Sequence, residues 1–474
     1  MEIDEKSIRL VVEEVLKNLV LESKSPLKTP AGKSGIFNDI DHAIRAASYA
    51  HKELLARTLE TRRNIIKAMR NAVLQILDPI SLMAVEETGL GRKDHKILKN
   101  KLAAEMTPGV EDLQPVSYTD DHGLMLTENA PYGVIGAITP STNPTETIIN
   151  NSISMISGGN AVVFNPHPNA KNVSCYLITM LNEAIVCAGG PENVITTIAG
   201  PTIESAQQLW AHPLISLLTV TGGPGVVRAA MKSGKKVIAA GPGNPPCVVD
   251  ETADIAKAAR DIVNGAGFDN NIVCIDEKEI LAVDSIADAL KSEMKKHGAF
   301  ELNRHQIQPL TEKVIADPGR EGHEGQANKE YIGKDAWYIA SRAVGLDVPK
   351  GTPILLCEVD PSHPLVWTEQ LMPLIPLVRF SNVDTAIDFA VRCEHGFRHT
   401  ASMHSKNIEK LSRMAKVMNC SLFVKNGSNF NGMAAGGAGY TSFTIASPTG
   451  EGFTRARTFT RERRCSLIDY FRIV

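Results

Sequence analysis

Cys274 stands in a sequence setting that suits a reactive thiol. It follows the polar segment Phe268–Val273, which Gly265 and Gly267 precede. A cysteine attacks as the thiolate, so its neighbours would have to lower the pKa of Cys274 for reaction at neutral pH. Most single cysteines are inert core residues, and the spacing leaves both interpretations open.

Two turns in the sequence could hold a phosphate group. Leu218–Gly225 runs from an apolar segment into a predicted helix at Val226–Lys232, and Ile138–Pro144 leads into a helix that starts near Thr145. Such turns bind phosphates because backbone N–H groups can approach where side chains are missing, and the helix N-terminus adds positive potential. Neither turn has the GxGxxG pattern. Each of them is therefore as compatible with a structural turn as with a nucleotide site.

The cysteines and histidines do not predict a metal site. The eight cysteines are scattered without a CxxC pair, which argues against a zinc ribbon and a disulfide framework. Their one local cluster, Cys393 and His395 with His399 nearby, lacks a fourth ligand. We therefore expect no metal.

The composition of the 474 residues argues against several partners. Fifty Lys and Arg against 53 Asp and Glu leave a formal net charge of −3, which offers no basic field for nucleic acid. The longest uncharged stretch, Thr147–Ala170, contains asparagines, glycines and prolines, so it does not predict a membrane helix. Acidic residues occupy the positions where a secretory signal has basic ones. We expect a cytoplasmic protein with no nucleic-acid or membrane partner.

The elements that must position these residues follow an α/β rhythm. Helical periodicity fills residues 37–107, and short apolar runs then alternate with helical segments, which is typical of a parallel sheet. The first predicted strands are Gly133–Ile138, Ala161–Phe164, Val194–Ile198, Leu217–Val220 and Lys236–Ala240. A second series comprises Glu279–Val283, Pro353–Val359, Leu374–Phe380 and Ser421–Val424. We expect two α/β domains with a break near Gly241–Pro246, where GPGNPP interrupts regular structure.

Both ends of the sequence carry apolar stripes that need a partner. Residues 1–20 place apolar side chains at helical spacing, and the Ser-, Pro-, Lys- and Gly-rich stretch after them predicts a flexible linker. The helix would either dock on its own protein or pack into a groove elsewhere as a targeting helix, and the linker favours targeting. The apolar tail Phe459–Val474 would either dock on its own domain or lie across a neighbouring subunit, and we favour a homo-oligomer.

Six segments form an ordered set along the chain: TPSTNPTETIINNSISMISGGNAVVFNPHP, LLTVTGGPGVV, VIAAGPGNPPCVVD, GFDNNIVC, TEQLMPLIP and TGEGFTRARTF. In order and spacing they resemble the aldehyde dehydrogenase superfamily, and most closely its CoA-acylating branch, which oxidises propionaldehyde or acetaldehyde in bacterial microcompartments. The resemblance covers nearly the whole chain from about residue 35. It implies an aldehyde dehydrogenase-like α/β fold with two Rossmann-like domains and a small β oligomerisation arm.

The resemblance also implies a division of the chain. Residues 1–20 would form an encapsulation-type helix that binds a microcompartment shell protein, and residues 21–35 a flexible linker. Residues 36–246, except about 119–133, would form the cofactor-binding domain. Residues 247–440 would form the catalytic domain, and about 119–133 and 455–474 the oligomerisation elements.

Within this family pattern, Cys274 occupies the position of the nucleophile. As a thiolate it would attack the aldehyde carbon to give a thiohemiacetal, whose oxyanion needs hydrogen-bond donors. Asn143 matches the side-chain donor, and the backbone N–H of Cys274 would be the second. For Asn143 the alternative is a simple Asn-Pro turn residue.

The resemblance assigns a further group of residues to NAD. Hydride would pass to the nicotinamide ring, whose ribose Glu369 would hold; otherwise Glu369 would be a solvated surface carboxylate. The pyrophosphate loop and the end of the cofactor-binding strand would be formed by Thr221, Gly222, Gly223 and Gly225, and by Thr139, Pro140 and Ser141.

Two departures from the hydrolytic branch matter for the reaction. Alignment on the turn IAAGPGNPP places Ala240 where the hydrolytic enzymes have a glutamate base that activates water. The thioester should then survive until the thiol of coenzyme A exchanges with Cys274. Asn165 and Pro168 replace a lysine and an acidic residue at the adenosine ribose, which leaves the choice between NAD and NADP open.

His399 lies in a stretch similar to the acylating branch, EHGFRHTASMHS. It would either approach the substrate or CoA, or serve as a hydrogen-bonded structural histidine, and the structural role is favoured. Cys393 and His395 are interpreted as structural.

We therefore expect a CoA-acylating, NAD-dependent aldehyde dehydrogenase, packaged in a bacterial microcompartment by its N-terminal helix. The nearest alternative is a hydrolytic aldehyde dehydrogenase that yields a free acid. Two others are a thiol acyltransferase or hydrolase without redox chemistry, and a non-catalytic interaction module delivered by its helix.

Overall fold

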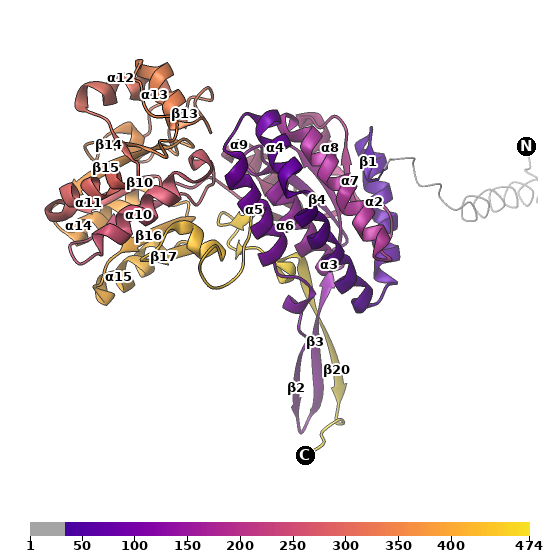
Figure 1. The fold of residues 1–474 in the computed structure, drawn as a ribbon. Helices are drawn as coiled ribbons and strands as arrows, with labels where there is room; N and C mark the ends of the chain where they lie inside the picture. The colour runs from indigo at the N-terminus through magenta and orange to yellow at the C-terminus, as the bar shows by residue number, and fades with distance from the viewer. Residues whose placement is uncertain (1–33) are drawn as a thin grey trace, which may run out of the picture.

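Two α/β lobes lie side by side and an extended arm projects from one of them (Figure 1). The computed structural model describes residues 34–474. The predicted helix over residues 1–20 lies outside the described residues, as does the predicted linker over 21–35 apart from its last two residues.

The first lobe is built on a six-stranded parallel sheet in the order β1-β6-β5-β4-β7-β8. Its strands are β1 (Ile36–Phe37), β4 (Val134–Thr139), β5 (Ala161–Pro166), β6 (Ile195–Ile198), β7 (Ile215–Thr221) and β8 (Val237–Ala240). The residues of β4, β5, β6 and β8 are all buried, because helices cover both faces of a parallel sheet. Every strand predicted for this lobe is present.

Eight helices belong to the first lobe. They are α2 (Ile40–Leu55), α3 (Leu59–Gln75), α4 (Leu77–Thr88), α5 (Lys93–Met106), α6 (Pro144–Ser157), α7 (Lys171–Cys187), α8 (Ile203–Ala211) and α9 (Pro224–Met231). The four helices α2 to α5 account for the helical periodicity predicted over residues 37–107. Both α6 and α9 begin with a proline, whose fixed φ suits the first turn of a helix.

The second lobe is built on a seven-stranded parallel sheet in the order β11-β14-β15-β10-β9-β16-β17. Its strands are β9 (Pro246–Val249), β10 (Glu279–Val283), β11 (Phe300–Glu301), β14 (Leu355–Glu358), β15 (Leu374–Phe380), β16 (Thr400–His404) and β17 (Leu422–Lys425). Its helices are α10 (Ile255–Ala266), α11 (Asp284–Lys296), α12 (Arg304–Val314), α13 (Ala336–Val344), α14 (Val383–Cys393) and α15 (Ile408–Met418).

Two central strands of this sheet were not predicted from the sequence. β9 is only four residues long and follows the proline-rich break, while β16 reads TASMH and carries polar side chains. Both are fully buried because they pair with each other in the middle of the sheet. Their position between other strands, and not a local apolar pattern, makes them strands.

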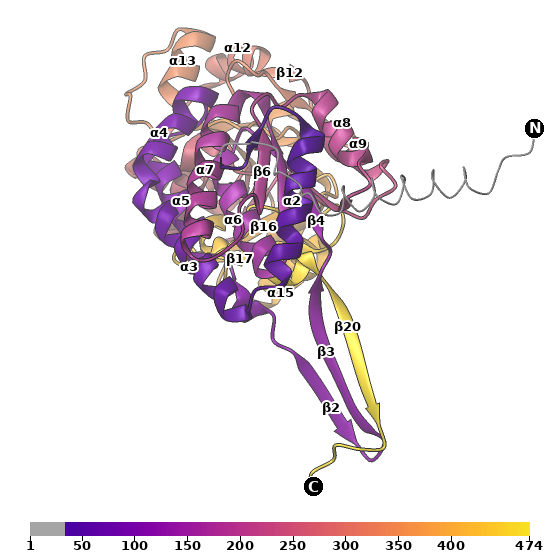
Figure 2. The same ribbon diagram turned by 90° about the vertical axis from the view of Figure 1, so that its right-hand side faces the viewer.

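The arm is an antiparallel sheet of three strands, β2 (Val116–Asp120), β3 (Gly123–Pro131) and β20 (Thr460–Ile468). It extends well beyond both lobes in two perpendicular views (Figure 2). All residues of β2 and most of β20 are exposed, and Tyr470, Phe471, Ile473 and Val474 beyond β20 are exposed as well. Nothing in the described chain covers this apolar tail.

The remaining strands are two short antiparallel pairs, β12 (Ile315–Asp317) with β13 (Gln326–Ala327) and β18 (Ile445–Ala446) with β19 (Gly452–Phe453). Residues Phe430–Phe459 return to the first lobe, where Phe443 and Phe459 join its apolar core. Across residues 34–474 the structure contains no helix that combines the length and the hydropathy of a membrane span.

Candidate active site

A cavity of about 1120 Å³ lies between the two lobes, at the carboxyl edge of the first sheet. The segments that follow β4, β5, β7 and β8 form one wall of the cavity. Residues 272–275, Glu369 and the β12–β13 region form the opposite wall. Ligands of open α/β sheets bind outside the carboxyl ends of the strands, so the fold itself marks this cavity as a ligand site.

The cavity brings together most of the residues that the sequence predicted for the site. Those that line it are Thr139, Pro140, Ser141, Asn143, Thr221, Gly222, Gly223, Cys274 and Glu369. Gly225 and His399 are not part of its wall. Among the residues 34–474, no cluster of His, Cys, Asp and Glu has the arrangement of a metal site.

Cys274 lies at the end of an unusual turn. Asp269, Asn270 and Asn271 have positive φ angles of 45°, 57° and 61°, a conformation that Asn and Asp adopt more readily than other side chains. The Asn271 side chain donates to the carbonyl oxygens of Ala266 and Glu277 at 2.8 and 3.0 Å. These bonds hold the backbone in place three residues before the thiol.

The Cys274 thiol is neutral in the ligand-free protein. Burial and the nearby carboxylate of Glu369 raise the pKa of Cys274 to about 12, and the charge of Lys278 only partly opposes them. The resting neighbours of Cys274 therefore disfavour its thiolate form.

Asn143 occupies the N-cap position of α6, but its side chain does not cap the helix. Asparagine at this position normally accepts a bond from the first helical N–H groups. Here its Oδ1 accepts a hydrogen bond of 2.6 Å from Nζ of the buried Lys99 instead. The Nδ2 group remains available as a donor at the cavity wall, its one bond being to Thr142 Oγ1 at 3.4 Å.

The glycine-rich turn after β7 leaves open space at the N-terminus of α9. A Cβ atom placed on Gly223 or Gly225 would meet no atom within 4 Å. Because backbone N–H groups at a helix N-terminus attract anions, the missing side chains make room for a phosphate group there.

Gly243 lies close to Cys274, His399 and Glu369. A Cβ atom on it would lie 2.7 Å from the carbonyl oxygen of Cys274 and 3.0 Å from Cγ of His399. Its N–H group faces Oε1 of Glu369 at 3.5 Å. Burial raises the pKa of Glu369 to about 7, so this carboxyl titrates in the physiological range.

His399 is fully buried behind this glycine. Its Nδ1 pairs with Oγ1 of Thr400 at 2.9 Å, and its backbone N–H donates to Glu394. Burial, together with the charge of Lys278, lowers the pKa of His399 to about 4, so the ring is neutral. Its neighbours Cys393 and His395 bond to Glu279 and to the carbonyl of Trp367.

The two sequence departures also lie on the cavity wall. Ala240 is the last residue of β8 and lines the cavity beside Gly241 and Pro242. Asn165 and Pro168 also line the cavity, and Oδ1 of Asn165 accepts a hydrogen bond of 2.5 Å from Ser205. Among the first-lobe residues that the structure describes, no carboxylate lines the cavity.

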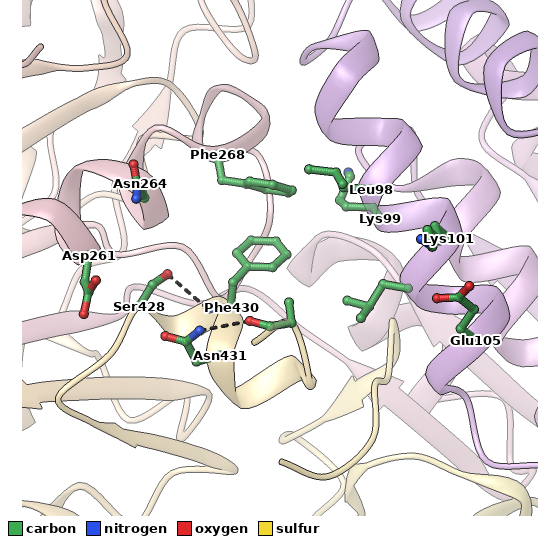
Figure 3. Close-up of a pocket in the computed structure, with 12 residues that line it drawn as sticks. Leu98, Lys99, Lys101, Glu105, Asp261, Asn264, Phe268, Ser428, Phe430 and Asn431 are labelled. Atoms are coloured by element: carbon green, nitrogen blue, oxygen red, sulfur yellow. Dashed lines mark hydrogen bonds between the residues drawn. The ribbon is translucent and has the colours of Figure 1, made fainter. Parts of the chain in front are cut away.

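A second, smaller cavity of about 410 Å³ was not predicted from the sequence. Figure 3 shows Leu98 and Lys99 of α5 on one side and Phe268 and Phe430 on the other. The rings of Phe268 and Phe430 are 4.1 Å apart, and Phe268 also stacks on His95 at 4.4 Å. Phe268 lies six positions before Cys274, which is the sequence signal that could have revealed this cavity.

One hydrogen bond links the walls of the two cavities. Lys99 lines the smaller cavity, and its ammonium group donates to Asn143, which lines the larger one.

The model of the aldehyde dehydrogenase family matches residues 33–455. The chain is 49% identical over 467 residues to the acetaldehyde dehydrogenase (acetylating) EutE of Escherichia coli, with coverage of 98% of this chain and 99% of that protein.

Two solved structures share the fold over nearly the whole described chain. One is the propionaldehyde dehydrogenase of Rhodopseudomonas palustris with bound CoA and an acylated cysteine, with a TM-score of 0.89, 46% identity and coverage of 92% of this chain and 99% of that one. The other is a propionaldehyde dehydrogenase from the fucose utilisation bacterial microcompartment of Clostridium phytofermentans, with a TM-score of 0.89, 45% identity and coverage of 93% and 100%.

Proposed function

The chain belongs to the aldehyde dehydrogenase family, and from that premise we propose that it converts a short aldehyde, NAD and CoA to acyl-CoA and NADH. The observation that carries the proposal is that Cys274 and Asn143 both line the large cavity at the carboxyl edge of the first sheet. Propionaldehyde and acetaldehyde are the proposed substrates, in line with the names of the relatives.

The first step forms a bond between Cys274 and the aldehyde. The Cys274 thiol gives up its proton to water, and the thiolate sulfur then attacks the carbonyl carbon while the electron pair of the C=O π bond moves to oxygen. Nδ2 of Asn143 and the N–H of Cys274 donate to that oxygen and stabilise its negative charge. A fixed donor that meets the charge only as it develops lowers the barrier of the step.

Oxidation then leaves an acyl group on the sulfur. NAD, when bound, supplies the acceptor for the hydride. As the C–H bond breaks, the oxyanion returns its electron pair to carbon, and Cys274 carries a thioester. Glu369 is proposed to hold the nicotinamide ribose, and the turn Thr221–Gly225 the pyrophosphate.

The acyl group leaves by thiol exchange. The sulfur of CoA, having lost its proton, bonds to the acyl carbon, and the bond to Cys274 breaks with the electron pair returning to the cysteine sulfur. Ala240 offers no carboxylate to activate water, so Cys274 keeps its acyl group until the thiol arrives. This feature separates the proposal from a hydrolytic aldehyde dehydrogenase.

The smaller cavity is proposed to receive the aldehyde chain. Leu98, Leu102, Phe268 and Phe430 form the apolar part of its wall, and the two phenylalanine rings are in contact there.

The test is NADH formation from propionaldehyde and NAD by the purified protein, with and without CoA. We expect steady turnover only with CoA, with propionyl-CoA as the product. Equal turnover without CoA, giving free propionate, would replace the proposal with a hydrolytic enzyme. Acyl transfer without any NADH would support the non-redox alternative.

We propose that the two lobes have different functions. Residues 36–246, except about 119–133, would bind the cofactor, and residues 247–440 would carry the nucleophile. The exposed arm and the apolar residues 467–474 support assembly of a homo-oligomer. Removal of residues 467–474 should lower the mass measured by light scattering, whereas an unchanged mass would contradict this role.

The proposed location is a bacterial microcompartment, with residues 1–20 bound to a shell protein. The apolar stripe in those residues supports it, as does the relative from a microcompartment. Deletion of residues 1–20 should abolish co-sedimentation with shells while CoA-dependent turnover stays at the full-length value. Unchanged co-sedimentation would contradict it.

A further inference from the structure

Four charged side chains lie fully buried behind the oxyanion donor. Lys96 and Lys99 belong to α5, Glu146 to α6, and Asp269 to the turn that leads to Cys274. Nζ of Lys99 lies 2.5 Å from Asp269 and 3.1 Å from Glu146, and Nζ of Lys96 lies 3.2 Å from Asp269. The two positive charges thus balance the two negative ones.

The Lys99 ammonium group lies among three oxygen atoms. It donates a hydrogen bond to Oδ1 of Asn143 and forms ion pairs with Asp269 and Glu146. An ammonium group donates only, so the amide atom that it contacts must be the oxygen. The Nδ2 group of Asn143 is thereby turned away from Lys99.

Lys96 holds the neighbouring backbone in the same way. Its Nζ donates to the carbonyl oxygen of Thr142 at 3.1 Å, one residue before Asn143. Asp269 also accepts from the backbone N–H of Arg92 at 2.7 Å, at the start of α5. One carboxylate therefore ties α5 to the segment of the oxyanion donor and to the segment of the nucleophile.

A purely structural role does not account for this arrangement well. Buried ion pairs stabilise a fold no better than apolar packing of the same volume, because both charges lose their hydration. The described contacts offer no comparable restraint on the Asn143 amide, whose Nδ2 has only the 3.4 Å contact with Thr142. A carboxamide without the ammonium group could rotate and present its oxygen to the reacting oxyanion.

We propose that Lys99 is a positioning residue for the aldehyde reaction: it holds Oδ1 of Asn143 so that Nδ2 faces the oxygen that becomes negative. This inference rests on the proposed function. The ammonium group also polarises the amide and strengthens Nδ2 as a donor, as expected within a chain of hydrogen bonds. Asp269 and Glu146 keep Lys99 charged: burial lowers its pKa, but these carboxylates outweigh burial and raise it above the usual value.

The test replaces Lys99 with methionine, which keeps the length of the chain and removes the ammonium group. We expect the rate of the NADH burst to fall about 10²-fold, the loss typical of one oxyanion donor. The Kd for NAD and the rate of Cys274 alkylation by iodoacetamide should stay at wild-type values. Lys93→Met on the same helix is the matched control, because Lys93 pairs with Asp78 at the surface.

A double variant tests whether Lys99 acts through Asn143 or independently of it. Lys99→Met combined with Asn143→Ala should be no slower than Asn143→Ala alone, since the lysine acts through the asparagine. Multiplicative losses, or a wild-type burst in Lys99→Met, would overturn the proposal.

Unbalanced charge could prevent Lys99→Met from folding, so a second variant keeps the cluster neutral. Lys99→Met with Glu146→Gln removes one positive and one negative charge and leaves Lys96 paired with Asp269. It should fold and show the same slow burst, and a wild-type burst would again overturn the proposal. If the wild-type protein itself forms no NADH with any short aldehyde and CoA, the proposed function fails first, which distinguishes the two failures.

Discussion

The two cavities on either side of the Lys99–Asn143 contact are built in different ways. The larger cavity is formed by backbone turns at the ends of parallel strands, and glycines leave its space open. The smaller one is formed by side chains, with Phe268 and Phe430 in contact on one side of it. A site formed by backbone turns can bind the same ligand in many proteins. A site formed by side chains can be altered by single substitutions.

The difference predicts which substitutions affect which ligand. Changes in the glycine turn should alter cofactor binding and leave the thiol untouched. Changes in the aromatic wall should alter the choice of aldehyde and leave the cofactor untouched. Four experiments test this separation.

The largest effect is expected at Cys274, which lines the larger cavity. Cys274→Ala removes the proposed nucleophile, so NADH formation should fall by roughly 10⁴-fold or more. The Kd for NAD, measured by calorimetry, should remain near the wild-type value, because the larger cavity keeps its wall. Residual turnover within 10-fold of wild type would show that another group carries the acyl chain.

A change in the backbone-built cavity should act on the cofactor alone. Gly223→Asp introduces a carboxylate into open space at the N-terminus of α9, where it repels the pyrophosphate that we place there. We expect the Kd for NAD to rise by about 30- to 100-fold, with the rate of Cys274 alkylation unchanged. Gly351→Asp, also at an open glycine, is the control. An equal Kd in the two variants would contradict the placement of the cofactor.

A change in the aromatic wall should act on the aldehyde alone. Phe430→Leu widens the smaller cavity, so kcat/KM for pentanal should rise relative to that for propionaldehyde by about 10-fold, on the order of one or two methylene groups. The Kd for NAD should not change. Phe380→Leu, which removes a ring that packs on Phe389 in the second lobe, is the control. An unchanged ratio would remove the smaller cavity from the aldehyde path.

The smallest effect concerns the charge that faces the thiol. Glu369 raises the pKa of Cys274, so Glu369→Gln should lower that pKa and speed alkylation by iodoacetamide several-fold in the absence of cofactor. The pKa of Glu369 is about 7, so the wild-type carboxyl is mostly neutral at pH 6 and ionised at pH 8. The two proteins should therefore react alike at pH 6 and diverge at pH 8. Divergence at both pH values would show that the charge is not the cause.

Some features of the fold could be predicted from local pattern. The runs that became β4, β5, β6, β7 and β8 are short, apolar and bounded by glycine or proline, so their strands were foreseen. The α/β fold class and the family predicted from the six quoted segments are confirmed. β16 was missed because its residues TASMH have no apolar pattern and become a strand only between their neighbours.

The candidate site was only partly visible in the sequence. Cys274, Asn143 and Glu369 were named through the resemblance, and the structure brings all three to one cavity, while their roles stay predictions. Gly225 and His399 do not reach the wall of that cavity. Lys99 was not named because a lysine in an amphipathic helix normally faces water, and its partners lie 44, 47 and 170 positions away.

The sequence by itself determined most strands of the first sheet and the family, since these depend on local composition and on ordered motifs. Only the tertiary structure decided which charges are buried together and which rings face each other. The reason is that burial and pairing depend on distances between elements remote along the chain. The balance between Lys96, Lys99, Glu146 and Asp269 exists only once α5, α6 and the turn before Cys274 have packed.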